Sequence, residues 1–462
     1  MKVIRIVLTL LLVAIAVQAF GLGGMAEGPV GTWVSGIQVQ NQSSTTANIT
    51  IEFRWAQNSS KPGQLAFTIT DTIAGNQSEV YYLPNITGFP EDFVGSAVVS
   101  SDQPVAAILN TSKTAAGTET DPKRIGAASG VLDPATTVYA PYLRKNYSGR
   151  NSYIAVQNTS TETAVVGITY RDHTGAEVAA AHETAVLSPT TTKIFYQDSN
   201  AGLPNEFHGS AVISGTQPVA VVVNNANDGT SWDKSQFESY NGLNQSATKL
   251  WVPKITANYS GYNTGLTIQN VGSSPATMQL VSTYGNLTSP AIQPGAAWSV
   301  YLPTSFPSAS SSGSATITSD QPVVGVVSEN KQSKGYGVVW SATPDGTGTV
   351  TVLFPKFDRN YSGYNGGIQI QNIGTAATTM QATFSFPGLT DVSITSGSIA
   401  AGNSWSVYGP SVAGLSEGFH GSVTVVSLGG QPIAGIYTSK NDGATAMGDY
   451  YSAYNGIQKG TP

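Results

Sequence analysis

The chain has 462 residues, of which 40% are hydrophobic and only 10% are charged, and its formal net charge at pH 7 is −6. Globular domains usually have about 25% charged residues, so hydroxyl, amide and glycine residues fill the difference here. The 21 Lys and Arg residues are scattered without a basic stripe, which argues against nucleic acid as a partner. The absence of cysteine excludes a disulfide framework, a thiolate nucleophile and a thiolate metal site.

The first 19 residues have the pattern of a secretory signal peptide. Lys2 and Arg5 form a charged start, Ile6–Val17 is an apolar stretch, and Val17-Gln18-Ala19 offers small residues at a cleavage site. An uncleaved N-terminal anchor is the alternative interpretation. We expect a secreted, cell-surface-associated chain with no membrane span after signal cleavage and with a linker over residues 20–28.

Four copies of one pattern organise the rest of the chain. Each copy has a Gly-Ser start, a β-branched run, a polar turn, Gln-Pro and a second apolar run. The copies are Gly95–Asn110, Gly209–Asn224, Gly313–Asn330 and Gly421–Tyr437. We interpret each copy as a β-hairpin, because Val, Ile and Thr suit strands and Pro lacks the N–H that a ladder needs. The second run is apolar without alternation, which predicts a strand covered on both faces, in a sandwich core or against a neighbouring domain.

Two further motifs recur at the same interval. An alternating strand that ends in Gln-Asn predicts one buried face; it spans 36–41, 152–158, 265–270 and 367–372. A third motif runs from a large apolar residue and Pro to Asn-Tyr-Ser-Gly; it begins at Tyr139, Trp251 and Leu353. We place it at the joins, where its aromatic residues either stack neighbouring domains with restricted hinge motion or close the end of each domain. The first unit lacks it, as terminal repeats often differ.

These patterns predict an all-β fold of four tandem antiparallel β-sandwich domains, Ig-like or jelly-roll-like, after an N-terminal signal peptide. The repeat interval far exceeds the 20–50 residues of solenoids and propellers, so each unit is expected to be a complete domain. The expected domains cover 29–136, 137–248, 249–350 and 351–462. We expect them to follow one another as a rod.

No catalytic constellation stands out. His208 and His420 share the context Phe-His-Gly-Ser, but two of the four repeats lack the histidine. Gly414–Gly418 matches Gly-x-Ser-x-Gly, yet a nucleophile elbow needs a helix after it, and none is expected there. We therefore expect no enzyme activity, no catalytic residue, no metal-binding residue and no obligatory cofactor.

Calcium is the one cofactor that the sequence leaves open. Asn227-Asp228-Gly229 and Asn441-Asp442-Gly443 follow an apolar strand, with Asp233 and Asp449 nearby. Oxygen atoms of this kind suit Ca²⁺, but tight turns explain the same residues more simply.

Asn-x-Ser/Thr sequons are frequent, which for a secreted chain suggests a glycoprotein. The alternative is that Asn, Ser and Thr are simply common turn residues here. The candidate glycosylation positions are Asn41, Asn48, Asn58, Asn76, Asn85, Asn110, Asn146, Asn158, Asn244, Asn258, Asn286 and Asn360.

The pattern Ile-Gln-Asn, Trp-Ser-Val-Tyr-Leu-Pro, Gly-Ser-Ala and Asp-Gln-Pro-Val within Ile268–Val323 resembles repeat domains of secreted proteins of prokaryotic cell surfaces. Such chains are adhesin-like or surface-layer-like, and the resemblance covers Pro29 to Gly456. It implies no functional residue. We expect a non-enzymatic structural or adhesive protein that contacts copies of itself or other surface proteins, and possibly glycans.

The alternative is a carbohydrate-binding secreted protein that uses exposed tyrosines at the joins. Aromatic faces beside amides and carboxylates are common in sugar sites. The candidate binding residues are Tyr147, Tyr259, Tyr262, Tyr361 and Tyr364.

Overall fold

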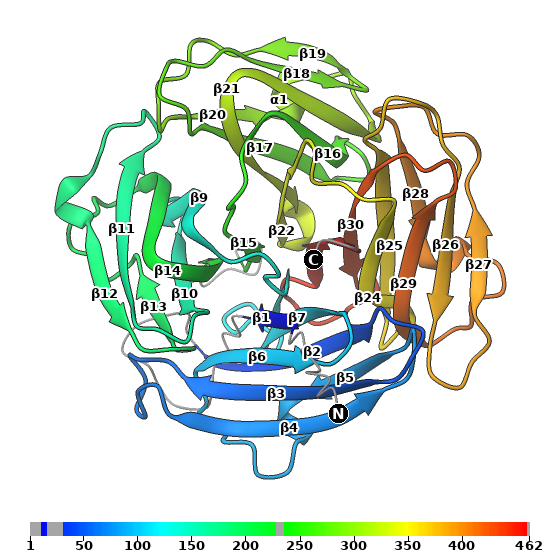
Figure 1. Ribbon diagram of the computed structural model, residues 1–462. Coiled ribbons are helices and arrows are strands. Elements are labelled where there is room, and N and C mark those ends of the chain that lie inside the picture. Colours follow the sequence, from blue (N-terminus) through cyan, green and yellow to red (C-terminus); the bar gives the residue numbers. More distant parts are fainter. Residues whose placement is uncertain (1–10, 16–30, 228–234, 460–462) are drawn as a thin grey trace, which may run out of the picture.

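The computed structural model describes residues 11–15, 31–227 and 235–459. The chain is all-β with antiparallel sheets, as the sequence predicts. Figure 1 shows four groups of strands, in sequence order, arranged around one common centre. Within the described residues, no helix is long and apolar enough to cross a bilayer. The helical elements in this described part of the chain are single turns: η1 (Leu83–Asn85), η2 (Ala179–Ala181), α1 (Leu302–Ser305), η4 (Gln332–Lys334) and η5 (Gly409–Ser411).

Each repeat contains an outer and an inner group of strands in the same order. In repeat 1 the outer sheet is β4 (Leu65–Ile73), β3 (Ala47–Trp55), β6 (Gly95–Ser101) and β1 (Leu11–Ile15). The inner sheet is β5 (Ser78–Tyr82), β2 (Thr32–Asn41), β7 (Val105–Thr114) and β8 (Arg124–Ser129). Side chains of both sheets share one apolar cluster.

Repeats 2 to 4 repeat this order, with one strand running through both groups in repeats 2 and 3. Repeat 2 has β12 (Glu183–Leu187), β11 (Ala164–Asp172), β14 (Phe207–Asn227), β9 (Ala135–Lys145), β13 (Thr192–Tyr196), β10 (Arg150–Asn158) and β15 (Phe237–Asn241). Repeat 3 has β19 (Gly285–Thr288), β18 (Met278–Ser282), β21 (Ser311–Lys331), β16 (Ala247–Ala257), β23 (Thr343–Pro344), β20 (Ala297–Tyr301), β17 (Asn263–Asn270) and β22 (Tyr336–Ser341). Repeat 4 has β27 (Val392–Thr395), β26 (Met380–Ser385), β29 (Phe419–Ser427), β24 (Thr351–Tyr361), β32 (Ile457–Gln458), β28 (Ser404–Tyr408), β25 (Tyr364–Asn372), β30 (Ile433–Lys440) and β31 (Tyr451–Asn455).

The prediction that each Gly-Ser copy is a β-hairpin is wrong. In repeat 2 the whole copy lies in the single strand β14, whose first half pairs with β11 and whose second half pairs with β10. The change of partner falls between Gly215 and Val219, at the Gln-Pro step. Pro218 has no N–H to give to a ladder, so the step suits a strand that leaves one sheet for the other.

The four repeats close into a ring, so the expected rod is wrong. The innermost strands contact one another in sequence, β8 with β15, β15 with β22, β22 with β31, and β31 with β8 again. Repeat 4 also reaches repeat 1 through Lys459, whose Nζ donates to the Gln42 carbonyl at 2.7 Å. The cause is the second apolar run, because its outward face packs on the neighbouring repeat. Ala106 of repeat 1, for example, packs against Leu353 and Ile457 of repeat 4.

The Gln-Asn motif explains how each repeat is closed and joined. Its asparagine is fully buried in all four repeats and plugs the following loop. In repeat 4 the Asn372 amide donates to the carbonyls of Ala376 and Ile399 at 2.8 and 2.9 Å and accepts from the Gly374 N–H. Asn41, Asn158 and Asn270 make the same three kinds of contact.

The glutamine of the same motif reaches the preceding repeat in three of the four cases. Gln269 donates to the Ser210 hydroxyl at 2.7 Å, Gln371 to the Ala315 carbonyl at 3.2 Å, and Gln40 of repeat 1 to Thr424 of repeat 4 at 3.4 Å. The Gln-Asn motif therefore connects neighbouring repeats of the ring as well as closing the loop that follows its own strand.

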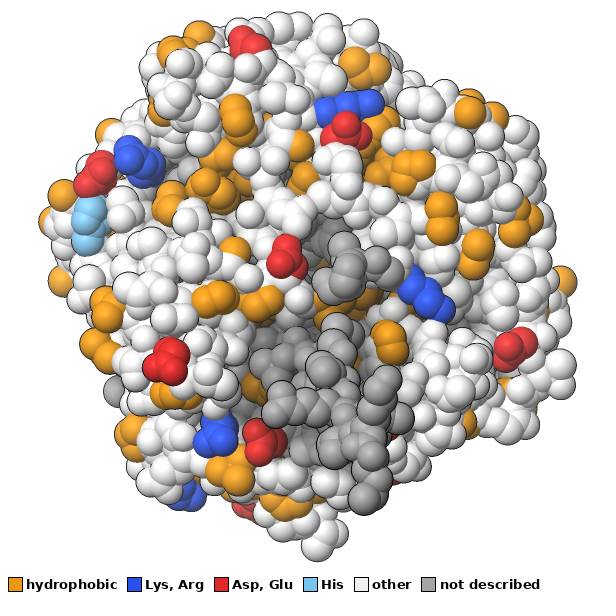
Figure 2. Space-filling model, viewed as in Figure 1, with side chains coloured by type: hydrophobic (Ala, Val, Ile, Leu, Met, Phe, Trp, Pro, Cys, Tyr) orange, Lys and Arg blue, Asp and Glu red, His pale blue; other side chains and the backbone are white. Residues whose placement is uncertain are grey.

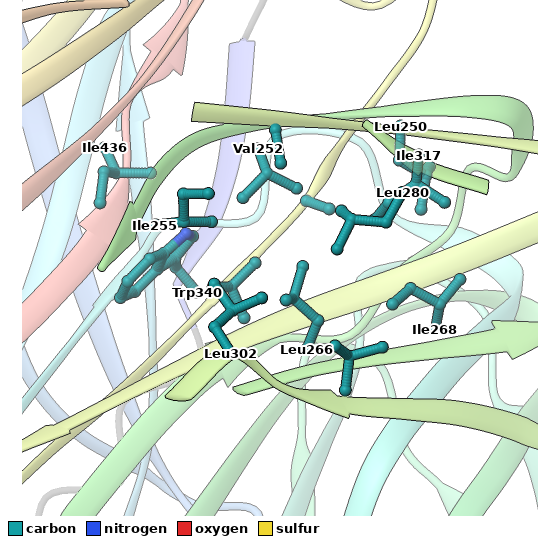
Figure 3. Packing of buried hydrophobic residues seen from close by; sticks show 14 of the residues in the cluster. Leu250, Val252, Ile255, Leu266, Ile268, Leu280, Leu302, Ile317, Trp340 and Ile436 are labelled. Atoms are coloured by element: carbon teal, nitrogen blue, oxygen red, sulfur yellow. The ribbon is translucent and has the colours of Figure 1, made fainter. Parts of the chain in front are cut away.

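Apolar packing fills the space between the strand groups. Figure 3 shows this for repeat 3, where Leu250, Leu266 and Ile317 point toward one another from three different strands. Trp340 of β22 and Ile436 of the next repeat border the same cluster. One cluster thus extends across a junction, which is how burial stabilises the ring rather than each repeat alone.

Candidate functional site

The three Asn-Tyr-Ser-Gly segments are tight turns within a repeat, between its first and second strands. The sequence analysis placed these segments at the joins between neighbouring repeats, and that placement is wrong. In repeat 2, Asn146 and Ser148 both have a φ of 52°, and cognate residues in repeats 3 and 4 have φ values of 50° to 52°. The Asn146 N–H donates to the Asn151 side chain at 2.7 Å, and Asn258 and Asn360 make the same bond to Asn263 and Asn365. Asn and Gly tolerate this left-handed backbone, which accounts for the motif.

Two of the three turn tyrosines rest on a histidine. The Tyr361 ring stacks on His420 with centroids 4.2 Å apart, and Tyr147 lies 4.2 Å from His208. Tyr259 has no such support, because repeat 3 carries Ser312 at the histidine position. Tyr259 and Tyr361 are nevertheless 48% and 44% exposed. The turns therefore present aromatic faces to solvent, with two of them held in place from below.

A buried carboxylate orients the histidine of repeat 4. Asp358, only 1% exposed, accepts from Tyr437 Oη at 2.9 Å and from Ser439 Oγ at 3.1 Å. Lys356 Nζ lies 3.4 Å from that same oxygen, and the other carboxylate oxygen lies 2.6 Å from His420 Nδ1. Burial alone would raise the pKa of Asp358, but Lys356, His420 and the hydroxyl donors outweigh it and hold the pKa below its usual value. The carboxylate is thus a fixed anion that keeps the imidazole under Tyr361.

Repeat 2 builds the same support with a second histidine beside the first. His208 stacks on His173 with centroids 4.3 Å apart, and the Arg144 guanidinium lies 5.8 Å from the Tyr147 ring. Burial, and then the nearby His173, lower the pKa of His208. The two histidine-backed turns therefore share a shape but differ in charge.

A second buried ionic cluster lies at the junction of repeats 3 and 4. Glu329 is fully buried; Lys254 Nζ lies 2.5 Å from one of its oxygens, and Thr256 donates to the other at 2.6 Å. Tyr451 of repeat 4 also donates its hydroxyl to Glu329. The cluster ties one repeat to the next.

Tyr262 was predicted to be an exposed binding residue, but it lies in this junction and is only 6% exposed. It therefore cannot form part of an exposed platform. Its ring packs edge-on against Tyr451, with Lys331 and Lys440 4.7 and 4.9 Å from its centroid. Tyr364 is half-buried beside Tyr450, and burial raises its pKa. Only Tyr147, Tyr259 and Tyr361 of the five predicted binding residues occupy turn tips.

Of the carboxylates proposed for calcium, Asp442 and Asp449 lie among the described residues, and they have different partners. Asp442 pairs with Lys440 at 2.6 Å and Lys331 at 3.8 Å, while Asp228 and Asp233 lie outside the described residues. In the described ranges 31–227 and 235–459, no three metal-ligating side chains gather. The Gly414–Gly418 segment is a loop followed by strand β29, so it lacks the helix of a nucleophile elbow.

Asp449 instead serves the centre of the ring. It is fully buried and accepts the N–H groups of Phe237 and Gly337 at 3.2 Å each and of Tyr451 at 3.0 Å. Its own N–H donates to the Lys123 carbonyl at 2.8 Å. All four repeats therefore meet at one residue. Burial raises the pKa of Asp449 well above its usual value.

The sequons occupy very different environments. Asn41 and Asn158 are the buried loop plugs described above, and a glycan could not be attached to either without breaking the fold. Asn110 and Asn244 are half-buried. The remaining candidates are exposed: Asn48, Asn58, Asn76, Asn85, Asn146, Asn258, Asn286 and Asn360.

Sequence analysis missed the two ionic clusters. A signal was available, because Lys254 lies within the otherwise apolar stretch Leu250–Ile255 and Glu329 follows the apolar run 323–327, in a chain with few charges. A charge beside apolar strand residues indicates a buried partner on another strand.

The comparisons with known proteins add little to this picture. No protein-family model matches the chain, and no curated protein matches it. Among solved structures, the chain is similar to the crystal structure of Thermotoga maritima 1070, with 17% identity over 24% of this chain and 95% of that chain and a TM-score of 0.21. A likeness at that score carries no argument about this chain.

Proposed function

We propose that this chain is a non-enzymatic, secreted structural or adhesive protein of the cell surface, and that its repeats are four β-sandwich domains joined as a ring. It would act through contacts with copies of itself, with other surface proteins or with glycans. One observation carries the proposal: the buried charges hold repeats together. Glu329 reaches Tyr451 of the next repeat, and Asp449 accepts N–H groups from two other repeats.

The visible surface supports the same view. In Figure 2, charged side chains are few and lie singly or next to one of opposite charge, and hydrophobic side chains lie singly or in small groups. A surface of amides and hydroxyls suits contacts that depend on many weak hydrogen bonds.

Protease treatment of intact cells tests the location. We expect the chain in the medium or on intact cells, where external protease removes it while a cytoplasmic marker stays whole. Protection from protease until the cells are lysed would contradict the proposal.

Carbohydrate binding at the tyrosine turns is the second candidate, and a specific observation favours it. Beside the Tyr361 ring, the Asn360 amide donates to Glu417 at 2.5 Å, so an aromatic face lies next to an amide and a carboxylate. Sugar C–H faces pack on such rings while the polar groups bind hydroxyls.

A glycan array with the purified chain tests this candidate. Any hit is then measured by calorimetry with Tyr361→Ala and with Tyr259→Ala, which removes an equally exposed turn tyrosine that has no histidine behind it. We expect Tyr361→Ala to weaken binding by about tenfold or more and Tyr259→Ala to have a smaller effect. Equal affinity in all three proteins would exclude the turns as the site.

A further inference from the structure

The first strand of repeat 1 differs from its counterparts in the other repeats. In repeats 2, 3 and 4, the strand beside the Gly-Ser strand is an 11-residue segment, β9, β16 or β24, that leads through a tight turn into the next strand. In repeat 1 that place is taken by β1, five residues long, from within the expected signal peptide.

The register of β1 matches that of its counterparts. Ile15 lies opposite Ala97 of β6, as Ala140 lies opposite Ala211 in repeat 2 and Phe354 opposite Val423 in repeat 4. Among the described residues, however, pairing in repeat 1 stops at Ala97. In repeats 2 and 4 the strand pairs further, as far as Phe207 and Phe419.

A groove of about 340 Å³ lies beside the loop that precedes β6. Trp33, Leu83, Ile86, Phe89 and Glu91 are among the residues that line it. The loop on the wall of the groove has the same backbone hydrogen bonds in repeats 1 and 4. In repeat 1, the Ile86 N–H donates to the Leu83 carbonyl and the Phe89 N–H to the Ile86 carbonyl. In repeat 4, the Val412 N–H donates to the Gly409 carbonyl and the Leu415 N–H to the Val412 carbonyl.

In repeats 2 and 4 a cation ends the strand at this loop, whereas repeat 3 has Ala257 at the same position. Lys145 donates to the carbonyls of Asn200 and Leu203 at 2.7 and 3.0 Å. Arg359 donates to the carbonyls of Val412 and Leu415, and its guanidinium lies 3.9 Å from Glu417. Lys145 lies five residues after Ala140, which is opposite Ala211. Arg359 lies five residues after Phe354, which is opposite Val423.

The cognate acceptors in repeat 1 are the carbonyls of Ile86 and Phe89 and the carboxylate of Glu91. The residue five places after Ile15 is Phe20, which brings no charge. The stretch that follows Ala19 begins Phe-Gly-Leu-Gly-Gly, and glycine weakens strands, so it is a poor replacement for β1.

We propose that repeat 1 of the exported chain is a strand-acceptor site for a partner polypeptide. The partner adds an extended segment antiparallel to β6, with an apolar residue opposite Ala97 and a Lys or Arg five residues later that binds Ile86, Phe89 and Glu91. Bare strand edges take up partner strands in this way, and backbone hydrogen bonds supply much of the affinity. The inference rests on export and removal of residues 1–19 in the proposed function.

Disulfide trapping tests the register, because the chain has no cysteine of its own. The exported chain carries Val98→Cys, and its N-terminus is first determined by mass spectrometry. The probe is a peptide of residues 135–145 with Tyr139→Cys, since Tyr139 lies opposite Val212, the cognate of Val98. Directly opposed residues of antiparallel strands lie close enough for a disulfide. The register control is the same peptide with Ala140→Cys.

We expect a mixed disulfide with the Tyr139→Cys peptide and little with the control. In a cysteine-free binding assay, Lys145→Ala in the peptide or Glu91→Lys in the chain should weaken binding by about tenfold. Failure to trap either peptide in a chain that still unfolds cooperatively would overturn the proposal, and so would equal trapping of both.

Two other outcomes also decide against it. A chain that forms its own disulfide dimer through position 98 and excludes the peptide would make a second copy the occupant. A secreted chain that keeps residues 1–19, and closes an internal disulfide when Ala14→Cys is combined with Val98→Cys, would make β1 a permanent strand. Neither result bears on surface location, which the protease experiment tests separately.

Discussion

The junction between repeats 1 and 2 and the junction between repeats 3 and 4 have the same backbone plan but different chemistry. At the first, Trp33 packs against Phe237 with ring centroids 4.6 Å apart, within an apolar cluster that includes Tyr153. At the second, Glu329 and Lys254 form a buried ion pair. The shared plan therefore comes from the repeated strands and amide plugs. The ion pair at the second junction is an addition to that plan, and it creates a dependence that substitution can reveal.

The largest expected effect is at the ionic junction. Lys254→Met leaves the fully buried Glu329 without its cation, and breaking a buried pair in this way costs about 3–5 kcal/mol in the free energy of unfolding. Urea denaturation measures the loss. The matched control is Lys61→Met at an exposed lysine whose ammonium lies over the Trp55 ring, which should cost no more than about 1 kcal/mol. Adding Glu329→Gln to Lys254→Met should restore part of the loss; no recovery would show that the charge is not the cause.

Removing the buried asparagine of the Gln-Asn motif should lower the free energy of unfolding by the same amount in every repeat, in contrast to substitutions at the junctions. Asn41→Ala and Asn372→Ala each leave buried backbone groups without a partner, at a cost of about 2–3 kcal/mol. Because their contacts are the same, the two losses should agree within about 1 kcal/mol, the usual scatter of such values. Chemical denaturation of the two variants measures both. A large loss at one plug and none at the other would contradict the shared plan.

Two buried aspartates should respond to pH in opposite directions. The pKa of Asp358 is lowered, so its contribution to stability is present above about pH 4 and is lost as pH falls through its folded pKa. The pKa of Asp449 is raised, so stability is lost as pH rises from about 4 toward its folded pKa. Each slope is at most about 1.4 kcal/mol per pH unit.

Unfolding measured by denaturant between pH 2 and pH 8 separates them. Asp358→Asn should flatten the curve on the acid side, and Asp449→Asn should flatten it at higher pH. If both variants changed the same limb, one of the two pKa directions would be wrong.

The smallest effect distinguishes two equally exposed tyrosines. Tyr361→Ala removes a ring stacked on His420 and should cost about 0.5–1.5 kcal/mol. Tyr259→Ala removes an unsupported ring and should cost less than about 0.5 kcal/mol. Thermal unfolding of both variants makes the comparison; equal losses would mean that the histidine does not support the turn.

Local structure was largely readable from the sequence. The strands that end in Gln-Asn were found because apolar and amide residues alternate there. The apolar runs were expected to be covered on both faces, and in repeat 2 Val221 faces its own core while Val222 packs in the cluster with Trp33 of repeat 1.

The errors concern which strands are partners. A polar turn with Gln-Pro serves a hairpin and a change of sheet equally well, so Gly215–Pro218 did not reveal that β14 continues. Likewise, an apolar residue on the outer face of a strand, such as Ala106, predicts that another element packs there but does not identify that element. Its partners, Leu353 and Ile457, lie at the other end of the chain. The tyrosine turns were placed at joins because their position in sequence precedes each repeat, whereas their hydrogen bonds close a turn inside it.

Small-angle X-ray scattering of the exported chain tests the closed ring most directly. A compact chain of this length should have a radius of gyration of about 23 Å. Four separate domains in a line, each about 13 Å in radius of gyration, would give about 40 Å. A value near the first supports contact between repeat 4 and repeat 1; a value near the second would contradict the ring and every junction described here.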